Sequence, residues 1–292
     1  MYGVSKIIEC KMSIYQQIKE KFIMKNARED WAPYRTELTE MILDRDPESV
    51  MIIGAGHCND IDLCRIAAAA GRVILLDIDK EATAGAVNML PEDLRDKVTC
   101  KEASLTGISE DDMEGFCDRL MEHAREAGKC HQTEIFREAL LTEIDTLEEK
   151  LISKEKDLND LIPKEAAEVV VCCGVCSQLF SSLSFYIRSL LYSLEDILPG
   201  VALLEEAFHE RIRRMNERII PAINRAIYKA AGKTAIFGNE NMPEAPVEGA
   251  YQCIMDVRGA FSPEERHLVW SFNKAQGITY DMLIQICDKN KL

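Results

Sequence analysis

Short apolar runs bounded by turn residues recur along the chain. They cover residues 49–53 and 72–79, and another starts at 167 and ends in a tight turn at Gly174. Runs of this kind are typical of strands that are buried on both faces of a sheet. A further strand is expected at 97–103, and segments with helical spacing, at 62–70 and 80–89, alternate with the first three strands. The alternation predicts parallel β-α-β units and therefore an α/β fold.

The N-terminal part of the chain has helical spacing instead. Ile7, Ile14, Ile18 and Phe22 fall on one face of a helix that we expect to extend from residue 1 to 43. Asp46-Pro47 ends this pattern. We therefore expect an N-terminal helical cap at 1–46, followed by a single domain at 47–292.

A long amphipathic segment separates the third strand from the fourth. Apolar residues recur within it at spacings of three, four and seven, and Lys154 interrupts the stripe that they form: Leu140, Ile144, Leu147, Leu151, Leu158 and Leu161. We expect a helical insertion at 109–163. Its stripe packs on the chain's own surface or, in the alternative interpretation, forms a dimer or lid element.

The C-terminal third is predicted to be helical first and then strand-rich. A helical stretch at 184–231 is interrupted at Pro199-Gly200, and a short fifth strand covers 232–238. Residues 239–249 are predicted to be a loop. Runs at 268–272 and 278–287, joined by a turn at Gly277, predict a closing hairpin.

The stretch VMIIGAGHCNDIDL, residues 50–63, indicates a ligand site. Gly54 and Gly56 lie where a buried strand turns sharply, and glycine there lets a ligand approach the backbone. Asp77 follows Gly56 by 21 residues, at the end of the second strand. An acid at about that distance can accept hydrogen bonds from ribose hydroxyls. Turn and acid together predict an adenosine-containing ligand, either NAD or S-adenosylmethionine.

The residues that follow the two glycines favour S-adenosylmethionine. A dinucleotide fingerprint needs a third glycine at position 59, where this chain has Asn59, with Asp60 after it. In a dinucleotide site the pyrophosphate binds the free N–H groups of this helix terminus. A carboxylate would compete for those groups and repel the phosphates. S-adenosylmethionine has no phosphate and carries a sulfonium and a methionine zwitterion, so it tolerates nearby acid.

These motifs, together with VILLDID, EASLTG and VVVCCGVCSQL, resemble those of class I S-adenosylmethionine-dependent methyltransferases. The resemblance covers about residues 50–237. It implies a Rossmann-like sheet of seven strands, the last antiparallel, with helices on both faces and the cofactor at the carboxyl ends of the first strands. In such a site Asp77 binds the ribose, Ile78 packs on the adenine, and Cys173 and Gly174 lie near the methyl group. The implied cofactor-binding residues are Gly54, Ala55, Gly56, Asn59, Asp60, Asp77, Ile78, Ser104, Leu105, Cys173, Gly174 and Gln178, and Ser177 would face cofactor or substrate.

One position departs from the family pattern. An acidic residue often follows the third strand and binds the adenine amino group, whereas here the matching stretch is Ala103-Ser104-Leu105. Ser104 can still hydrogen-bond, so adenine binding is expected to be weaker but not lost.

Charge and cysteine content narrow the choice of partners. The formal net charge is −15, with acid spread along the chain, which disfavours a phosphate backbone or an anionic lipid surface as partner. Eleven cysteines and no secretory or membrane-spanning pattern lead us to expect reduced thiols in a cytoplasmic protein. We expect a small-molecule acceptor, no nucleic acid, no membrane and no metal, and the oligomeric state stays open.

Several residues have two interpretations. Cys172, Cys173 and Cys176 pack in the core and turn or, less favoured, form a metal or redox group; Cys64 and Cys100 are expected in the core. His57 lines the cofactor or acts as a base. Asp79 competes with Asp77 for the ribose role.

Two further sites also remain open at this stage. Trp31 and Tyr34 belong to the core or close over the pocket, and His209 lies on a solvated helix face or near the substrate.

The predicted function is methyl transfer from S-adenosylmethionine to an unidentified acceptor. No catalytic residue is evident, because the sulfonium is already activated and catalysis rests mainly on alignment. A base is needed only if the nucleophile arrives protonated. The alternatives are a non-catalytic protein that binds adenosine or a partner on the same scaffold, and an NAD(P)-dependent oxidoreductase.

Overall fold

The structure is a computed structural model that describes residues 17, 20, 21 and 23–289. Ile7, Ile14, Ile18 and Phe22 of the expected N-terminal stripe lie outside the described residues. Contacts between residues divide the chain into two compact units. The sheet unit contains residues 24–107, 150–179 and 213 onward, and the helical unit contains 108–149 and 180–212. The proposed boundary between a cap and a methyltransferase domain at residue 46 stays a prediction.

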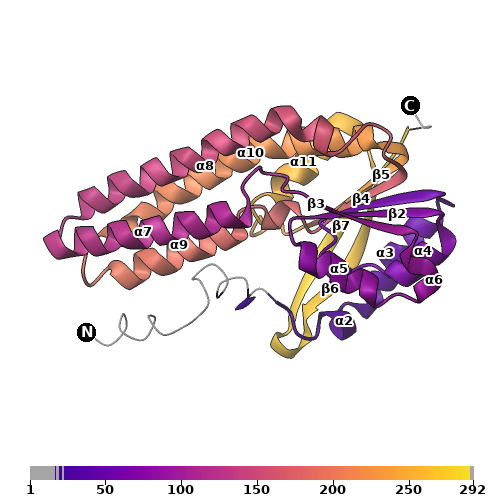
Figure 1. Cartoon of the computed structure of the whole chain (residues 1–292), viewed down its shortest axis with the longest axis horizontal. Coiled ribbons are helices and arrows are strands. Elements are labelled where there is room, and N and C mark those ends of the chain that lie inside the picture. Colours follow the sequence, from indigo (N-terminus) through magenta and orange to yellow (C-terminus); the bar gives the residue numbers. More distant parts are fainter. Residues whose placement is uncertain (1–16, 18–19, 22, 290–292) are drawn as a thin grey trace. The chain divides into compact units, whose positions relative to one another are not determined.

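The sheet unit is built on seven strands in the order β3-β2-β1-β4-β5-β7-β6 (Figure 1). β1 to β5 are parallel, and β7 is antiparallel to both its neighbours. This is the Rossmann-like sheet of seven strands that the sequence predicted, with helices on both faces and the last strand antiparallel. The strands are β1 (Ser49–Ile53), β2 (Arg72–Asp77), β3 (Val98–Glu102), β4 (Ala167–Cys173), β5 (Ala231–Glu240), β6 (Glu264–Asn273) and β7 (Ile278–Asp288).

Helices cover the two faces because alternate strand residues point in opposite directions. One face packs on α3 (Ala32–Leu43) and α4 (Leu63–Ala69), whose apolar residues share a core cluster with Ile52 and Val171. The opposite face packs on α11 (Ala250–Phe261), where the rings of Phe237 and Phe261 lie 6.3 Å apart. Tyr228 of α10 (Leu204–Ala230) stacks on Phe261, so α10 joins the same layer.

The strand order places a switch point between β1 and β4. β1 leads through α4 to β2 on one side, and β4 leads towards β5 on the other. Ligands of open α/β sheets bind outside the carboxyl ends of the strands at this point. The loops after β1 and β4 are therefore the place to look for a site.

The structure corrects several expected boundaries. The helix predicted over 1–43 is interrupted at residues 23–26, followed by α2 (Ala27–Asp30) and α3. β5 reaches Glu240, so part of the predicted loop is strand, and α11 was not predicted. Cys64 and Cys100 are exposed, not core, because α4 and the edge strand β3 turn them outward.

The helical unit contains α7 (Glu110–Cys130), α9 (Ser181–Leu194), the first part of α8 (Thr133–Leu161) and the start of α10. α7 begins with a capping box between Ser109 and Asp112, which satisfies free N–H groups of the first turn. It ends at His131, whose φ of 52° is left-handed. The predicted helical insertion at 109–163 is thus present, as two helices.

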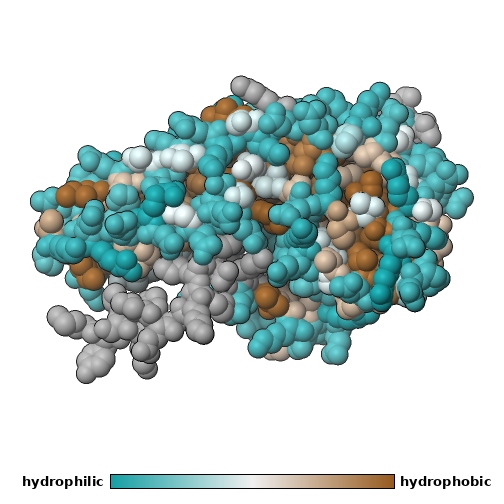
Figure 2. All heavy atoms as spheres, in the orientation of Figure 1, coloured by the Kyte–Doolittle hydropathy of each residue, from teal (hydrophilic) through white to brown (hydrophobic). Residues whose placement is uncertain are grey.

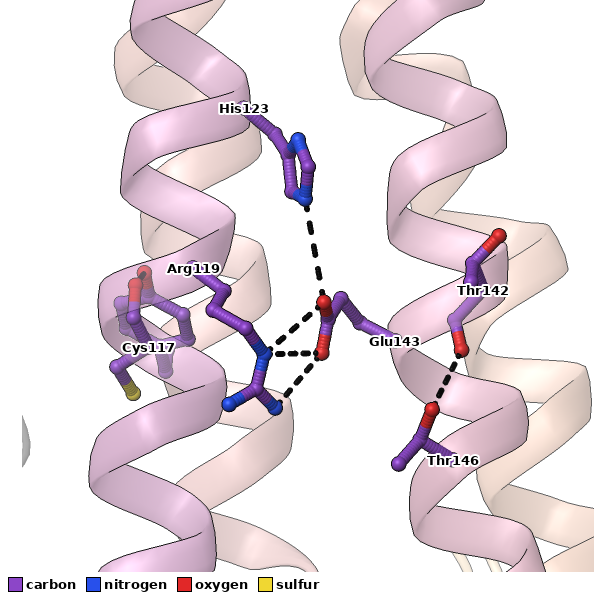
Figure 3. A network of polar contacts seen from close by, with 7 residues as sticks. Cys117, Arg119, His123, Thr142, Glu143 and Thr146 are labelled. Atoms are coloured by element: carbon purple, nitrogen blue, oxygen red, sulfur yellow. Dashed lines mark hydrogen bonds and ion pairs between the residues drawn. The ribbon is translucent and has the colours of Figure 1, made fainter.

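An ion pair between the exposed Arg119 and the buried Glu143 joins α7 to α8 (Figure 3). The Arg119 Nε atom donates to both carboxylate oxygens of Glu143, at 3.0 and 2.9 Å, and Nη2 lies 2.8 Å from Oε2. His123 approaches the same carboxylate at 3.9 Å. The paired geometry offsets the cost of burying Glu143 between helices.

The apolar stripe of α8 is buried within the chain. Leu140, Ile144, Leu147, Leu151 and Leu158 are each at most 2% exposed, and Leu161 is half-buried. Lys154, which interrupts the stripe, lies with its stem against Gly107, where an added Cβ would stand 2.6 Å from Lys154 Cβ. The burial agrees with the interpretation in which the helix packs on its own chain. None of the described helices is long and apolar enough to cross a membrane.

The basic segment around residues 211–218 is neutralised by acids of α8 and of its own helix. Arg211 pairs with Asp145 and Glu148, and Arg213 pairs with Glu217. Arg218 pairs with Glu155. The face drawn in Figure 2 is mostly hydrophilic, with hydrophobic residues in separate patches. These arginines do not form a free cationic patch of the kind that binds nucleic acid.

We predict that the double variant Leu147→Asp with Leu151→Asp lowers the thermal midpoint by about 10 °C or more without changing the oligomeric state. Both side chains are 1% exposed, so the variant buries two charges that have no partner. Thr146→Asp with Ser153→Asp adds the same charge at exposed positions of α8 and serves as the control. An oligomer in the parent that becomes a folded monomer in the double variant would instead show that the stripe is an interface.

Candidate functional site

The glycine loop after β1 is packed on one side and open on the other. Gly54 and Gly56 both have left-handed backbones, with φ of 71° and 46°. A Cβ on Gly54 would stand 2.2 Å from Cγ2 of Val175, in the loop after β4, whereas a Cβ on Gly56 would meet nothing within 4 Å. Gly54 therefore lets the two loops of the switch point touch, and Gly56 leaves room for a ligand beside the backbone. Ala55 between them is buried.

Asp77 links the end of β2 to this loop. Its Oδ2 accepts a hydrogen bond from the Gly56 N–H at 2.7 Å, and its Oδ1 accepts one from the Asp79 N–H at 2.8 Å. Each carboxylate oxygen has two lone pairs, so both retain capacity to accept from a ligand hydroxyl. Ile78 beside it is 39% exposed and offers an apolar surface at the same edge.

Asp79 has a different task from Asp77. Its Oδ1 accepts from the Ala82 N–H at 2.9 Å and caps the N-terminus of α5 (Lys80–Asn88). This observation favours Asp77 over Asp79 as the acid that faces a ligand.

Two acids stand where a dinucleotide-binding protein would hold pyrophosphate. Asp62 caps α4, with its Oδ1 accepting from the Arg65 N–H at 3.1 Å. Asp60, half-buried just before it, has its pKa raised from 3.8 to about 6 by burial and by Asp77, while Arg35 acts in the opposite direction. The terminus is thus already occupied by carboxylate.

Asn59 and His57 lie on the outer side of the same loop. The Asn59 carbonyl accepts from Arg35 Nη1 at 2.8 Å. His57 is exposed, 3.9 Å from a Cβ built on Gly85 of α5. Both line a pocket of about 140 Å³ with Arg28 and Arg35.

The segment after β3 forms another edge of the site. The hydroxyls of Ser104 and Thr106 lie 3.2 Å apart, and Leu105 is buried. Ser104 is half-buried, which leaves it at the surface where an adenine ring is expected.

The loop after β4 contributes Cys173, Gly174 and Gln178. Cys173 is buried, and burial, reinforced by Asp60, raises the pKa of its thiol. Gly174 has a φ of 66°, and its N–H donates to the Gly238 carbonyl at 2.8 Å. Gln178 is exposed, and its Nε2 lies 3.9 Å from a Cβ built on Gly174.

The neighbouring thiols have the character of core residues. Cys172, Cys173 and Cys176 are buried, and burial raises the pKa of the Cys172 and Cys173 thiols. The pKa of Cys176 is raised by its contact with Cys253 and by burial. Protonated, enclosed thiols are poor nucleophiles and poor metal ligands. Among the described residues no group of three or more His, Cys, Asp or Glu could hold a metal ion.

Sequence reasoning missed one acidic residue next to this site. Glu240 ends β5 and is 7% exposed, and its Oε1 accepts from the Ser177 hydroxyl at 2.9 Å. It lay in a segment predicted to be a loop. The available signal was the same as for Asp77, namely an acid at the carboxyl end of a buried strand.

No family profile matches the chain, and no curated protein matches its sequence. Solved structures of methyltransferases are similar to the chain at low sequence identity. The N-methyltransferase NodS from Bradyrhizobium japonicum WM9, in complex with S-adenosyl-L-homocysteine, is 11% identical over 94% of this chain and 97% of its own, with a TM-score of 0.43. A SAM-dependent methyltransferase from Aquifex aeolicus is 8% identical over 93% and 97%, with a TM-score of 0.41. Similarities this distant do not identify a function, which has to come from the site itself.

We predict that Gly54→Ala destabilises the chain more than Gly56→Ala. Both variants force an alanine into a left-handed backbone at a cost of about 1–2 kcal/mol, but only the first also meets Val175. Adding Val175→Ala to Gly54→Ala should recover part of the free energy of unfolding, measured by denaturant titration. Equal losses in the two single variants would show that the loops after β1 and β4 do not touch.

Proposed function

We propose that the protein is an S-adenosylmethionine-dependent methyltransferase that acts on a small molecule. The observation that carries this proposal is the acidic N-terminus of α4, where Asp62 caps the helix and Asp60 lies beside it. A pyrophosphate would have to displace one carboxylate and approach another. A sulfonium ligand with a free ammonium group gains from the same acids.

The residues at the switch point fit such a ligand. The open side of Gly56 gives space next to the backbone, and the remaining lone pairs of Asp77 suit the ribose hydroxyls. Ile78 offers an apolar surface for the adenine, and Asp60 offers a carboxylate for the methionine ammonium. When bound, the cofactor would supply an activated methyl group. The chain has to hold donor and acceptor in line and exclude water.

A small-molecule acceptor is supported by the charge of the surface. The net charge is −15. In the densest basic segment, Arg211, Arg213 and Arg218 form ion pairs with acidic residues: Asp145, Glu148, Glu155 and Glu217. A nucleic-acid substrate would meet repulsion from this net charge, and the arginines of this described segment are held in ion pairs.

We predict that the purified chain binds S-adenosylhomocysteine in calorimetry and binds NAD more weakly or not at all. A methyl-transfer assay with S-adenosylmethionine and a metabolite pool then separates an enzyme from a non-catalytic binding protein. Tighter binding of NAD than of S-adenosylhomocysteine would overturn the cofactor assignment.

Asp77→Ala should weaken the binding of S-adenosylhomocysteine by about 5- to 150-fold, because buried ligand hydroxyls lose an acceptor worth ~1–3 kcal/mol. The variant also releases the Gly56 and Asp79 N–H groups, so we expect a measurable loss of stability as well. Asp79→Ala is the control: it removes the cap of α5, costs about 1 kcal/mol of stability and leaves affinity unchanged. The reverse pattern would make Asp79 the ligand-binding acid.

Asp60→Asn should raise the stability of the ligand-free chain at pH 7 and lower its affinity for S-adenosylhomocysteine. Because the pKa of Asp60 is higher in the folded chain than when unfolded, its favourable contribution is complete below about pH 4 and is lost as the pH rises through about 6. Removing the charge should therefore recover ~1–3 kcal/mol at pH 7 and almost nothing at pH 4.

The affinity of the parent chain should fall between pH 7 and pH 5, as Asp60 becomes protonated and loses its attraction for the ligand ammonium. In the Asn variant this pH dependence should be much weaker. Asp62→Asn keeps a capping oxygen and leaves Asp60 in place, so it should keep the parent's pH dependence of stability and of affinity. An unchanged pH profile in the Asp60 variant would show that Asp60 does not face the ligand.

A further inference from the structure

Five aromatic side chains gather on the sheet face that α3 covers. The Trp270 ring lies at the centre, stacked on Tyr34 at 5.4 Å and edge-on to Trp31 at 4.8 Å. Phe272 and Tyr280 lie 5.0 and 6.0 Å from the same ring. We call this group the aromatic cluster: Trp31, Tyr34, Trp270, Phe272 and Tyr280.

Strand register places Glu240 on the same face as the cluster. Glu240 pairs with Met282 of β7, and Met282 pairs with Leu268 of β6. Trp270 lies two residues after Leu268 on β6, and it pairs with Tyr280, two residues before Met282 on β7. Paired residues share a face, and so do residues two apart. The charge of Glu240 adds to the effect of burial in raising the pKa of Tyr34 and of Tyr280.

The same register connects the cluster to the loop after β4. Cys173 pairs with Gly238, two residues before Glu240, so both point to this face. A Cβ on Gly174 would lie 3.9 Å from the Trp270 ring. β5 lies next to β4, about 4.8 Å away, on the side opposite to β1 and its glycine loop. Glu240 at the end of β5 is therefore one strand away from Cys173 and Gly174, where the methyl group is expected.

Glu240 is a buried carboxyl without a countercharge. The Ser177 hydroxyl satisfies Oε1, but Oε2 has no hydrogen-bond partner, and no ion pair with a cation is found for it in the described part of the chain. Burial raises the pKa of Glu240. Trp270 Nε1 is also buried without a partner. The Tyr34 hydroxyl has only the weakly accepting Cys173 thiol beside it. Buried polar groups of this kind are usually completed by a ligand, ion or water.

We propose that the aromatic cluster and Glu240 form the methyl-acceptor site, and that the acceptor is an amine whose ammonium group pairs with Glu240 against the rings. This inference rests on the proposed function and names its substrate class. An ammonium group supplies the missing countercharge and three donors, and aromatic faces attract cations within about 6 Å. Glu240 directly precedes the loop at 241–249, most of which is exposed.

Glu240 then serves as the base that an amine requires. The ammonium donates a proton to the Glu240 carboxylate, which Ser177 orients, and the freed nitrogen lone pair attacks the methyl carbon. A carbon–nitrogen bond forms as the carbon–sulfur bond breaks, and its electron pair stays on sulfur. The product leaves as a methylated ammonium, and Glu240 passes its proton to water.

Calorimetry on the full chain saturated with S-adenosylhomocysteine tests the acceptor class. The probes are phenethylamine against 2-phenylethanol, and butylamine against butan-1-ol. We expect each amine to bind at least tenfold more tightly than its alcohol. Glu240→Gln should abolish this preference while the affinity for S-adenosylhomocysteine is kept. Glu244→Gln removes an exposed acid four residues away and should change neither measurement.

Mass spectrometry with S-adenosylmethionine and phenethylamine should show an N-methyl product from the parent, reduced at least 100-fold in Glu240→Gln. Amines that bind no better than alcohols, or a preference that survives Glu240→Gln, would overturn the proposal and leave the cofactor assignment intact. Loss of the preference for S-adenosylmethionine over S-adenosylhomocysteine in Glu240→Gln, with amine binding unchanged, would assign Glu240 to the sulfonium instead. Failure of the parent to bind S-adenosylhomocysteine would be a failure of the proposed function.

Discussion

The hydrogen bond from the Gly56 N–H to the Asp77 carboxylate is the contact on which the site depends. It holds the turn after β1 against the end of β2, while Gly54 brings the same turn against Val175 of the loop after β4. The Asp77 carboxylate and the absence of a side chain at Gly54 thereby fix the ends of β1, β2 and β4 relative to one another. Asp77 and Val175 thus contact the turn at Gly56 and Gly54, while the other side of Gly56 stays open.

A cost in stability accompanies this geometry. Burial raises the pKa of Asp60 to about 6, and the nearby charge of Asp77 adds to this rise. A fold selected for stability alone would place an amide or an apolar residue there. Retention of the acid makes sense where a cationic ligand restores the balance, which is the trade between stability and activity that functional sites commonly show.

The sequence was informative where one physical rule dominates. Buried strands 49–53, 72–77 and 167–173 show as apolar runs, and the turn at Gly54 and Gly56 shows because glycine adopts that left-handed backbone without strain. The distinction between Asp77 and Asp79 could not be made from spacing, because it depends on which carboxylate caps α5. α11 and the last residues of β5 were missed because their surroundings are polar and proline-rich, and tertiary pairing with β7 overrides local preference. Trp270 and Tyr34 are 236 positions apart, so no local pattern links them.

Three partly or fully buried acids show how context separates structural from functional charge. Glu143 is enclosed between helices, but the Arg119 guanidinium satisfies both its oxygens, so the pair needs nothing further. The charge of Arg35 acts to lower the pKa of Asp60 but does not cancel the effect of burial. Glu240 accepts a hydrogen bond from the Ser177 hydroxyl on Oε1, and its Oε2 has no hydrogen-bond partner among the described residues. A buried carboxyl with an open lone pair is costly unless something binds there. Glu143 therefore has its countercharge within the chain, whereas Asp60 and Glu240 are the acids that a cationic ligand would complete.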